Sequence, residues 1–277
     1  MARFEFSEGA LEVAAEGAGE AMLLLHAGTS NAGQWRRYGG LLGPGLRLYA
    51  VDLPGHGRST LGRAPTVEGL FAGSVAALGE LVEAVAPGER VHLVGHSVGG
   101  LMALLVAMRA PERVRSLCLF EPVAFDLLER LGPPEVAAEC RAIARSCLEA
   151  VEAGEPALSM ERFVGYWGGR GLWGLMGAAE RAAAIAGAEA LHRVGIPATF
   201  AVMLPPELLA ERLGGVPMVV AAGERSPAPA RTIAEHLARV VPGAELRVIA
   251  GAGHMAPISH AAEFAAVVAS LVARTRG

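Results

Sequence analysis

One serine of this chain lies in a sequence pattern that suits a covalent nucleophile. Residues 95–99 read Gly-His-Ser-Val-Gly, which matches the Gly-x-Ser-x-Gly pattern of a nucleophile elbow. The apolar run over 90–94 predicts a strand before it, and the apolar run over 100–108 predicts a helix that ends before Pro111. Ser97 is therefore expected on a tight strand-to-helix turn, with its hydroxyl exposed at the positive end of the helix.

A serine hydroxyl is a poor nucleophile until a base removes its proton, so a histidine must approach Ser97. Of the eight histidines, His254 lies in a glycine-rich loop, 251–257, between the last predicted strand and the last predicted helix. A loop at the carboxyl end of a strand can bring its histidine to Ser97, and we predict that His254 is the general base. We expect His96 to be structural and His56 to brace its own loop.

The attack would also create an oxyanion, which needs two backbone N–H groups aimed at it. We expect one from Val98, the residue after the serine, and one from Gly28, in the loop 26–31 after the first predicted buried strand. The same loop fits an ordinary turn capped by Ser30 or Asn31, and the two interpretations are compatible.

The elements that must position these residues alternate along the chain. A hairpin is predicted over 4–15. Strands are predicted over 21–25, 46–51, 90–94, 114–120, 216–222 and 245–250, and helices over 66–86, 100–108, 230–240 and 260–274. This alternation predicts an α/β fold with a mostly parallel, doubly wound sheet, in which ligands bind at the carboxyl ends of the strands.

The alternation stops over residues 125–213, which are mostly helical in pattern and contain Trp167 and Trp173. We expect a core formed by residues 1–124 and 214–277. Residues 125–213 are then a helical cap, inserted after the strand that follows the nucleophile helix. The alternative is a helical extension that packs on the core without covering a site.

Four stretches of the chain, taken in order, resemble the α/β-hydrolase family. They are residues 26–28 (His-Ala-Gly), 51–59 (Val-Asp-Leu-Pro-Gly-His-Gly-Arg-Ser), 95–100 (Gly-His-Ser-Val-Gly-Gly) and 253–255 (Gly-His-Met). The resemblance covers nearly all of the chain outside the predicted cap. It implies the α/β-hydrolase fold, with Ser97 as nucleophile and His254 as base, and leaves the substrate open because this fold supports many chemistries.

The acid of the expected triad is where the chain departs from the family. Most members carry an aspartate three residues after the glycine that closes the strand equivalent to 216–222, and here that position holds Ser226. Some members place the acid after the strand that follows the nucleophile helix, where this chain has Glu121. We predict Glu121 as the acid that orients His254. Glu224 is the alternative acid, and Asp126 or the lack of an acid remains open.

A serine at the elbow disfavours haloalkane dehalogenases and epoxide hydrolases of this fold, which need a carboxylate there. The pattern predicts a serine hydrolase that cleaves carboxylic esters of small to medium apolar acyl or aryl groups through an acyl-enzyme. The same triad would serve hydrolysis of a C–C bond, a thioester or a lactone. A hypothesis of another class is a non-catalytic ligand-binding protein on a hydrolase scaffold.

The amino-acid composition limits the classes of partner and cofactor that we expect for this chain. The net charge is −4 without a basic cluster, which argues against nucleic acid. All 24 basic residues are arginine, which excludes Schiff-base lysine chemistry and a lysine-held pyridoxal cofactor. The three cysteines have no metal-ligand spacing, and neither a metal nor an organic cofactor is implied. No secretory signal or membrane-length apolar run is evident, so we expect a cytoplasmic protein that acts on a small molecule. The sequence carries no signal for an oligomeric state.

Overall fold

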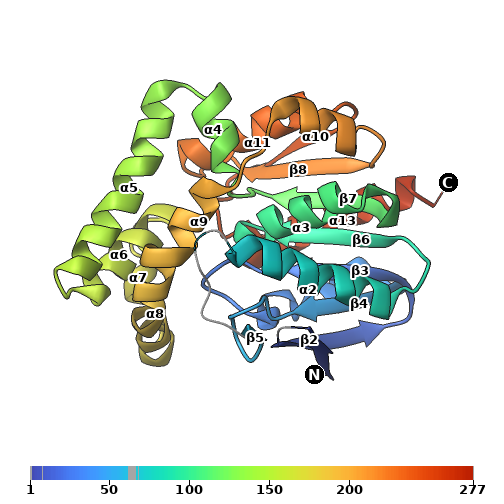
Figure 1. Cartoon of the computed structure of the whole chain (residues 1–277), viewed down its shortest axis with the longest axis horizontal. Helices are drawn as coiled ribbons and strands as arrows, with labels where there is room; N and C mark the ends of the chain where they lie inside the picture. The colour runs from blue at the N-terminus through green and yellow to red at the C-terminus, as the bar shows by residue number, and fades with distance from the viewer. Residues whose placement is uncertain (1, 8, 62–66, 68, 277) are drawn as a thin grey trace.

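The computed structural model of the chain describes residues 2–7, 9–61, 67 and 69–276. A single sheet runs through it in the order β1-β2-β4-β3-β6-β7-β8-β9, with β5 beside β2 (Figure 1). From β4 onwards along this order all neighbouring strands are parallel, whereas β2 is antiparallel to β1, β4 and β5. The strands are β1 (Ala2–Phe6), β2 (Gly9–Gly17), β3 (Gly19–Leu25), β4 (Gly45–Val51), β5 (Thr60–Leu61), β6 (Val91–His96), β7 (Val114–Phe120), β8 (Met218–Gly223) and β9 (Glu245–Ile249).

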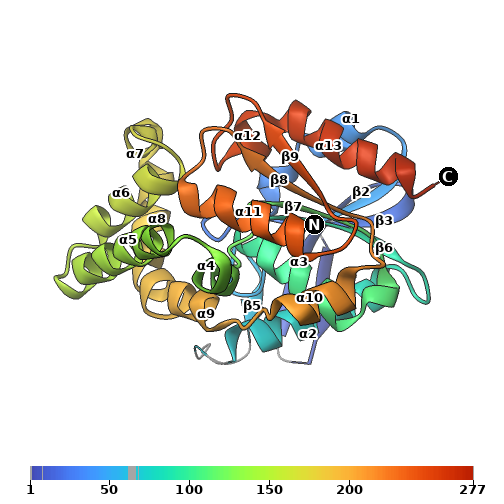
Figure 2. The ribbon, with the colours of Figure 1, turned by 90° about the horizontal axis from the view of Figure 1, so that it is seen from above.

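Helices cover both faces of this sheet (Figure 2). On one face lie α2 (Leu70–Val85), α3 (Val98–Arg109) and α11 (Ala228–Val240), and on the other lie α1 (Tyr38–Leu42) and α13 (Ala261–Arg274). Successive residues of a strand point to opposite faces, so Leu23 packs in one apolar layer and Leu24 in the other. Every residue of the central strands β6 and β8 is buried, as expected of parallel strands covered on both sides.

The predicted fold class is confirmed, and the predicted strands and helices agree with the observed ones to within a few residues. The helix predicted over 66–86 is described as α2 from Leu70, and Thr66, its predicted first residue, lies outside the described residues. Features that were not predicted from sequence include the helix α1, the short strand β5 and the pairing of β2 with β4, through which the N-terminal hairpin extends the sheet.

Between β7 and β8 the described chain is helical, and we call residues 125–213 the helical insertion. Its helices are α4 (Phe125–Leu131), α5 (Pro134–Glu152), α6 (Pro156–Trp167), α7 (Leu172–Leu175), α8 (Ala178–Ala190), a π-helical turn (Leu191–Gly195), α9 (Ile196–Ala201) and α10 (Pro206–Leu213). Helices α5 to α8 lie beyond one end of the sheet, whereas α10 returns to pack against α3 and α11 (Figures 1 and 2). Buried Asp126, in α4, accepts a hydrogen bond from the backbone N–H of Leu204 (2.7 Å), which ties the first helix of the insertion to its last connection.

Among the described residues, none of the helices is both long and apolar enough to cross a bilayer.

Candidate active site

Ser97 lies between β6 and α3 on a strained turn. Its backbone angles are φ 56° and ψ −119°, in a region that L-residues rarely occupy and that costs about 1–3 kcal/mol. The flanking glycines make the turn possible. A Cβ at Gly95 would collide with the backbone of Gly99 and Gly100, and a Cβ at Gly99 with the carbonyl groups of the chain at the end of β3. The Ser97 N–H donates to the carbonyl of Phe120 (3.0 Å), which holds the turn against the end of β7.

His254 and Glu121 form a short polar contact in the site. His254 Nδ1 lies 2.6 Å from Glu121 Oε2, and the other carboxylate oxygen accepts the N–H of Gly223, also at 2.6 Å. Glu121 is 1% exposed and His254 is 5% exposed. Because a carboxylate only accepts, Nδ1 of the imidazole must donate, which leaves Nε2 of the neutral ring free to accept a proton. The buried carboxylate is thus fully partnered and sets the tautomer of the histidine.

The backbone of Glu121 explains how this carboxylate turns towards His254. Glu121 has φ 44°, the second positive value found for a non-glycine residue in the described ranges, and its N–H donates to the carbonyl of Ala221 in β8 (3.0 Å). The chain therefore leaves β7 in a left-handed turn at the point where the adjacent strand β8 is about to end.

Ser97 and His254 are brought to the same edge of the sheet. The His254 ring lies 4.9 Å from the ring of His96, the residue before the serine, and 5.3 Å from the ring of Trp167 in α6. In the described part of the chain, the hydroxyl of Ser97 and the imidazole of His254 form no direct hydrogen bond. A serine–histidine contact that is loose without substrate and tightens when substrate binds is common in such sites.

Gly28 and Val98, the predicted oxyanion donors, lie side by side. A Cβ placed on Gly28 would lie 3.2 Å from Cγ1 of Val98. Within the described ranges, neither backbone N–H donates a hydrogen bond to another group of the chain. Val98 is also the first residue of α3, where the helix dipole favours negative charge. Two free amides at this position have the chemistry that an oxyanion requires.

A side chain that sequence reasoning missed connects these two loops. Gln34 is buried, and its Oε1 accepts the N–H of Ala27 (3.2 Å) and lies 3.4 Å from Nδ1 of His96. It stands in a short 3₁₀ turn, Ala32–Trp35, that is capped by the side chain of Asn31, as one interpretation of this loop predicted. Nothing in the local pattern around Gln34 marked it, because its two partners come from different strand ends.

Other polar residues of the family-like motifs brace this edge. His26 Nε2 accepts the N–H of Leu53 (2.9 Å) while Nδ1 donates to the carbonyl of Ala27 (2.7 Å), and burial lowers the pKa of His26 to about 4. Asp52 accepts the N–H groups of Ala32 (2.7 Å) and Arg58 (2.9 Å). These neutral and charged hydrogen bonds fix the loop that carries Gly28. Burial lowers the pKa of His96, which keeps it neutral.

The alternative acids have other partners. Exposed Glu224 accepts the N–H of Gly251 (2.7 Å), and Asp126 accepts the guanidinium of Arg130 (2.7 Å) besides the backbone of the insertion. Ser226, at the position where most of the family has its aspartate, is buried, and its hydroxyl has no hydrogen-bond partner among the described residues. Of the three carboxylates considered from the sequence, Glu121 is the one that the structure brings to His254.

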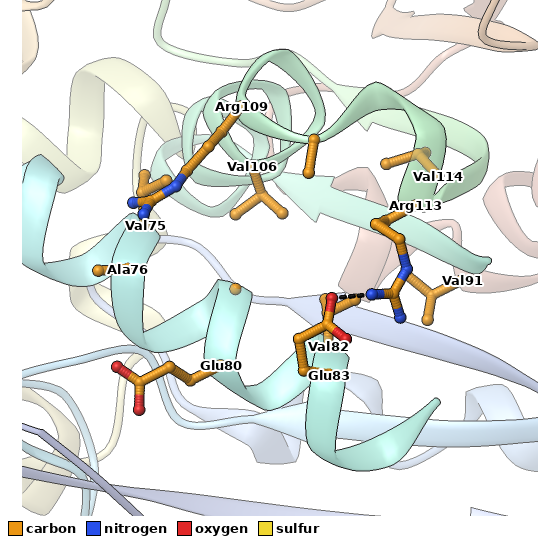
Figure 3. A pocket seen from close by; sticks show the side chains of 12 residues that line it. Val75, Ala76, Glu80, Val82, Glu83, Val91, Val106, Arg109, Arg113 and Val114 are labelled. Atoms are coloured by element: carbon orange, nitrogen blue, oxygen red, sulfur yellow. Dashed lines mark ion pairs between the residues drawn. The ribbon is translucent and has the colours of Figure 1, made fainter. Parts of the chain in front are cut away.

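A groove of about 290 Å³ lies away from these residues, between α2 and α3 (Figure 3). Val91 and Val114, the first residues of β6 and β7, line it, and an ion pair between Arg113 and Glu83 closes one side. Ser97 follows the opposite end of β6, so this groove is not part of the site. In the part of the chain that the structure describes, no group of three or more His, Cys, Asp or Glu side chains is arranged to hold a metal ion.

Comparisons with known proteins bear on the family and the fold of this chain. The model of the "Alpha/beta hydrolase family" matches residues 22–267. A pimeloyl-(acyl-carrier protein) methyl ester esterase of Pectobacterium carotovorum is 43% identical over 103 residues, which are 37% of this chain and 37% of that protein. The dihydrolipoyllysine-residue acetyltransferase component of the acetoin cleaving system of Cupriavidus necator is 30% identical over 257 residues, which are 91% of this chain and 63% of that protein. Both alignments span less than two thirds of these relatives.

Among solved structures, the 2-hydroxy-6-oxo-6-phenylhexa-2,4-dienoate hydrolase of a Rhodococcus strain superposes with a TM-score of 0.78. The superposition covers 98% of this chain and 97% of that one at 21% sequence identity. At this identity the likeness shows the fold alone.

Proposed function

The chain belongs to the alpha/beta hydrolase family, and from that premise we propose that it is a serine hydrolase of carboxylic esters with small to medium apolar acyl or aryl groups. The observation that carries the proposal is the 2.6 Å contact between Glu121 Oε2 and His254 Nδ1, at the edge of the sheet where Ser97 stands on its strained turn. The partial likeness to a methyl ester esterase supports esters as the first substrates to test.

In the proposed reaction, Ser97 Oγ attacks the ester carbonyl while His254 Nε2 takes the hydroxyl proton. The carbonyl oxygen becomes an oxyanion and receives the N–H groups of Gly28 and Val98. His254 then gives its proton to the leaving alkoxide, and the C–O bond of the ester breaks. A water deprotonated by His254 then attacks the acyl-enzyme. The bond between the acyl carbon and Ser97 Oγ breaks, His254 returns the proton to Ser97 Oγ, and the carboxylic acid leaves.

Glu121 acts in each step through its contact with His254. The imidazolium that forms when the serine proton moves carries a positive charge in a buried place, where an unpaired charge is costly. The Glu121 carboxylate offsets that cost, and the N–H of Gly223 keeps the carboxylate oriented. Because hydrogen bonds and packing already hold the loop of Gly28 and the ring of His254, these groups need little reorganisation during the reaction.

The helical insertion is proposed to act as a cap that shapes the substrate pocket. Trp167 of α6 packs against His254, and behind it lie Phe125, Phe163 and Phe200 in ring contact with one another or with Trp167. Apolar walls of this kind suit an acyl or aryl group and disfavour highly charged substrates. Cleavage of a C–C bond, a thioester or a lactone would use the same three residues and is tested with the same protein.

The decisive experiment measures hydrolysis of p-nitrophenyl esters from acetate to decanoate, with fluorophosphonate labelling alongside. Wild type should turn over these esters and label at Ser97, and Ser97→Ala should lose both properties because no nucleophile remains. If wild type labels but cleaves none of the esters, the substrate class is wrong, and thioesters, lactones and ring-cleavage diketones are the next set. Wild type that neither labels nor cleaves would overturn the enzyme proposal in favour of a ligand-binding protein.

A further inference from the structure

His192 is a buried histidine that the proposed reaction does not use. It lies in the π-helical turn Leu191–Gly195 between α8 and α9 and is 2% exposed. Neither of its ring nitrogens has a hydrogen-bond partner among the described residues. An imidazole presents one donor and one acceptor when neutral, and leaving such groups unpaired in the interior is unfavourable. π-Helical turns are rare and occur frequently at functional sites, so both observations call for a ligand of this side chain.

A small cavity lies against His192. Its volume is about 10 Å³, which is room for a single water-sized polar atom. The other walls are apolar or weakly polar and come from α4, α5, α6 and α9: Phe125, Cys140, Ile143, Ala144, Phe163, Trp167, Ile196 and Phe200. Burial raises the pKa of Cys140 to about 12, so its thiol is neutral as well. His192 is thus the strongest hydrogen-bonding group in an otherwise apolar chamber.

This chamber adjoins the proposed active site through one ring. Trp167 lines the chamber and also lies 5.3 Å, between ring centroids, from His254. On the chamber side, Phe163 stands 6.5 Å from Trp167 and meets His192 edge-on at 5.4 Å. The indole is therefore the wall between the proposed base and His192.

We propose that the indole of Trp167 turns aside when an acyl chain binds at Ser97, and that the chamber, enlarged in this way, is a distal subsite of the substrate pocket. There His192 binds a neutral oxygen, a keto or hydroxyl group, carried towards the far end of the acyl chain. The inference rests on the proposed ester hydrolysis and names its substrate class: oxygenated medium-chain acyl esters, preferred over plain ones.

The chemistry of the chamber favours a neutral group over a carboxylate. Burial lowers the pKa of His192 to about 4, so the ring is uncharged at neutral pH and offers one N–H donor and one lone pair. None of the lining residues carries a charge at that pH. A carboxylate would lose its hydration without a countercharge, whereas a keto or hydroxyl oxygen needs one or two hydrogen bonds that His192 can supply.

The test compares p-nitrophenyl octanoate with its 5-, 6- and 7-hydroxy and 5-, 6- and 7-oxo derivatives. Wild type should favour at least one oxygenated ester over octanoate by about tenfold or more in kcat/KM, since a site built to hydrogen-bond a group discriminates against the analogue that lacks it. In His192→Phe this preference should fall to about one. His192→Asn, which keeps a donor and an acceptor, should retain part of it.

Activity on p-nitrophenyl acetate and fluorophosphonate labelling separate the two proposals. The acetyl group is too short to reach the chamber, so both His192 variants should match wild type within about twofold in these controls, and their melting temperatures report folding. If the controls hold and no oxygenated ester is favoured, or if His192→Phe keeps the preference, the subsite is wrong while the esterase proposal stands.

A binding experiment keeps the subsite testable if ester cleavage fails. Calorimetry on Ser97→Ala with octanamide and its oxo and hydroxy derivatives should show the same preference, of about tenfold in Kd, and its loss when His192→Phe is added. Equal affinities for plain and oxygenated amides would overturn the subsite directly.

Discussion

The carboxyl ends of β7 and β8 are neighbours in the sheet, and the polar residues that follow them differ in burial and in hydrogen bonding. Phe120 of β7 pairs with Ala221 of β8, so the residues that follow them emerge at the same edge. After β7 comes Glu121, buried, with both carboxylate oxygens bonded. After β8 come Glu224, exposed and bonded to a loop, and Ser226, buried with no hydrogen-bond partner among the described residues.

In this chain the carboxylate beside His254 therefore comes from the end of β7. β8 still contributes to the carboxylate, but through its backbone, because the N–H of Gly223 binds the Glu121 oxygen that does not face His254. The charge beside His254 is supplied from β7, where the left-handed turn at Glu121 directs the carboxylate towards the imidazole.

The largest effect is expected when each carboxylate is neutralised in turn. Glu121→Gln keeps the size of the side chain, but its amide N–H points at His254 Nδ1. The ring proton must then lie on Nε2, and a protonated Nε2 cannot accept the proton of Ser97. We expect kcat/KM on p-nitrophenyl butyrate to fall roughly 10³- to 10⁴-fold. Glu224→Gln is the matched control and should stay within about threefold of wild type. Equal losses in the two variants would show that the ends of β7 and β8 do not differ as described.

A second experiment moves the charge to the other strand. Glu121→Ala/Ser226→Asp should recover about 10- to 100-fold of the kcat/KM lost in Glu121→Ala, because the family resemblance puts an aspartate at 226 and the residue is buried beside Gly223. Glu121→Ala/Ser226→Asn, which has the same size without the charge, should recover nothing. Recovery by both double variants would point to packing as the cause, and recovery by neither would mean that position 226 does not face His254.

A third prediction concerns the free energy of unfolding and the histidine that follows β3. His26 follows β3, and burial lowers its pKa from 6.5 to about 4, so the unfolded chain binds more protons than the folded one between these values. The free energy of unfolding should therefore rise with pH across this window and fall on acidification, by up to about 1.4 kcal/mol per pH unit from this residue. Urea unfolding at pH 5, 6, 7 and 8 measures the slope. In His26→Asn the slope should become shallower, and an unchanged slope would assign it to other groups.

Much of this architecture could be predicted from the sequence, because side-chain periodicity and backbone sterics act within a few residues of each position. Period-two and apolar runs predicted β3, β4, β6, β7, β8 and β9, and the glycines at 95 and 99 predicted the turn at Ser97, since only residues without a Cβ allow the neighbouring backbone so close. The loop position of His254, after the last strand, followed from the same alternation. The catalytic roles of these residues and of Gly28 and Val98 stay predictions.

Other parts depended on contacts between distant segments. Three carboxylates, Glu121, Glu224 and Asp126, were candidates from the sequence, and the choice required the left-handed turn after β7 and the loop before His254 to meet across 133 residues. Gln34 carried no motif because it joins two strand ends. No sequence pattern marked His192 either, because its unpaired nitrogens and the cavity beside it are properties of the folded chain.

The sequence by itself therefore determined the order of strands and helices, the strained serine and the loop that holds the histidine. These follow from side-chain periodicity and backbone sterics within a few residues of each position. Only the tertiary structure decided which carboxylate reaches His254 and which buried histidine is left without a partner. Hydrogen bonding and burial are properties of the groups that surround a side chain, and in a parallel sheet those groups come from strands and helices far apart in the chain.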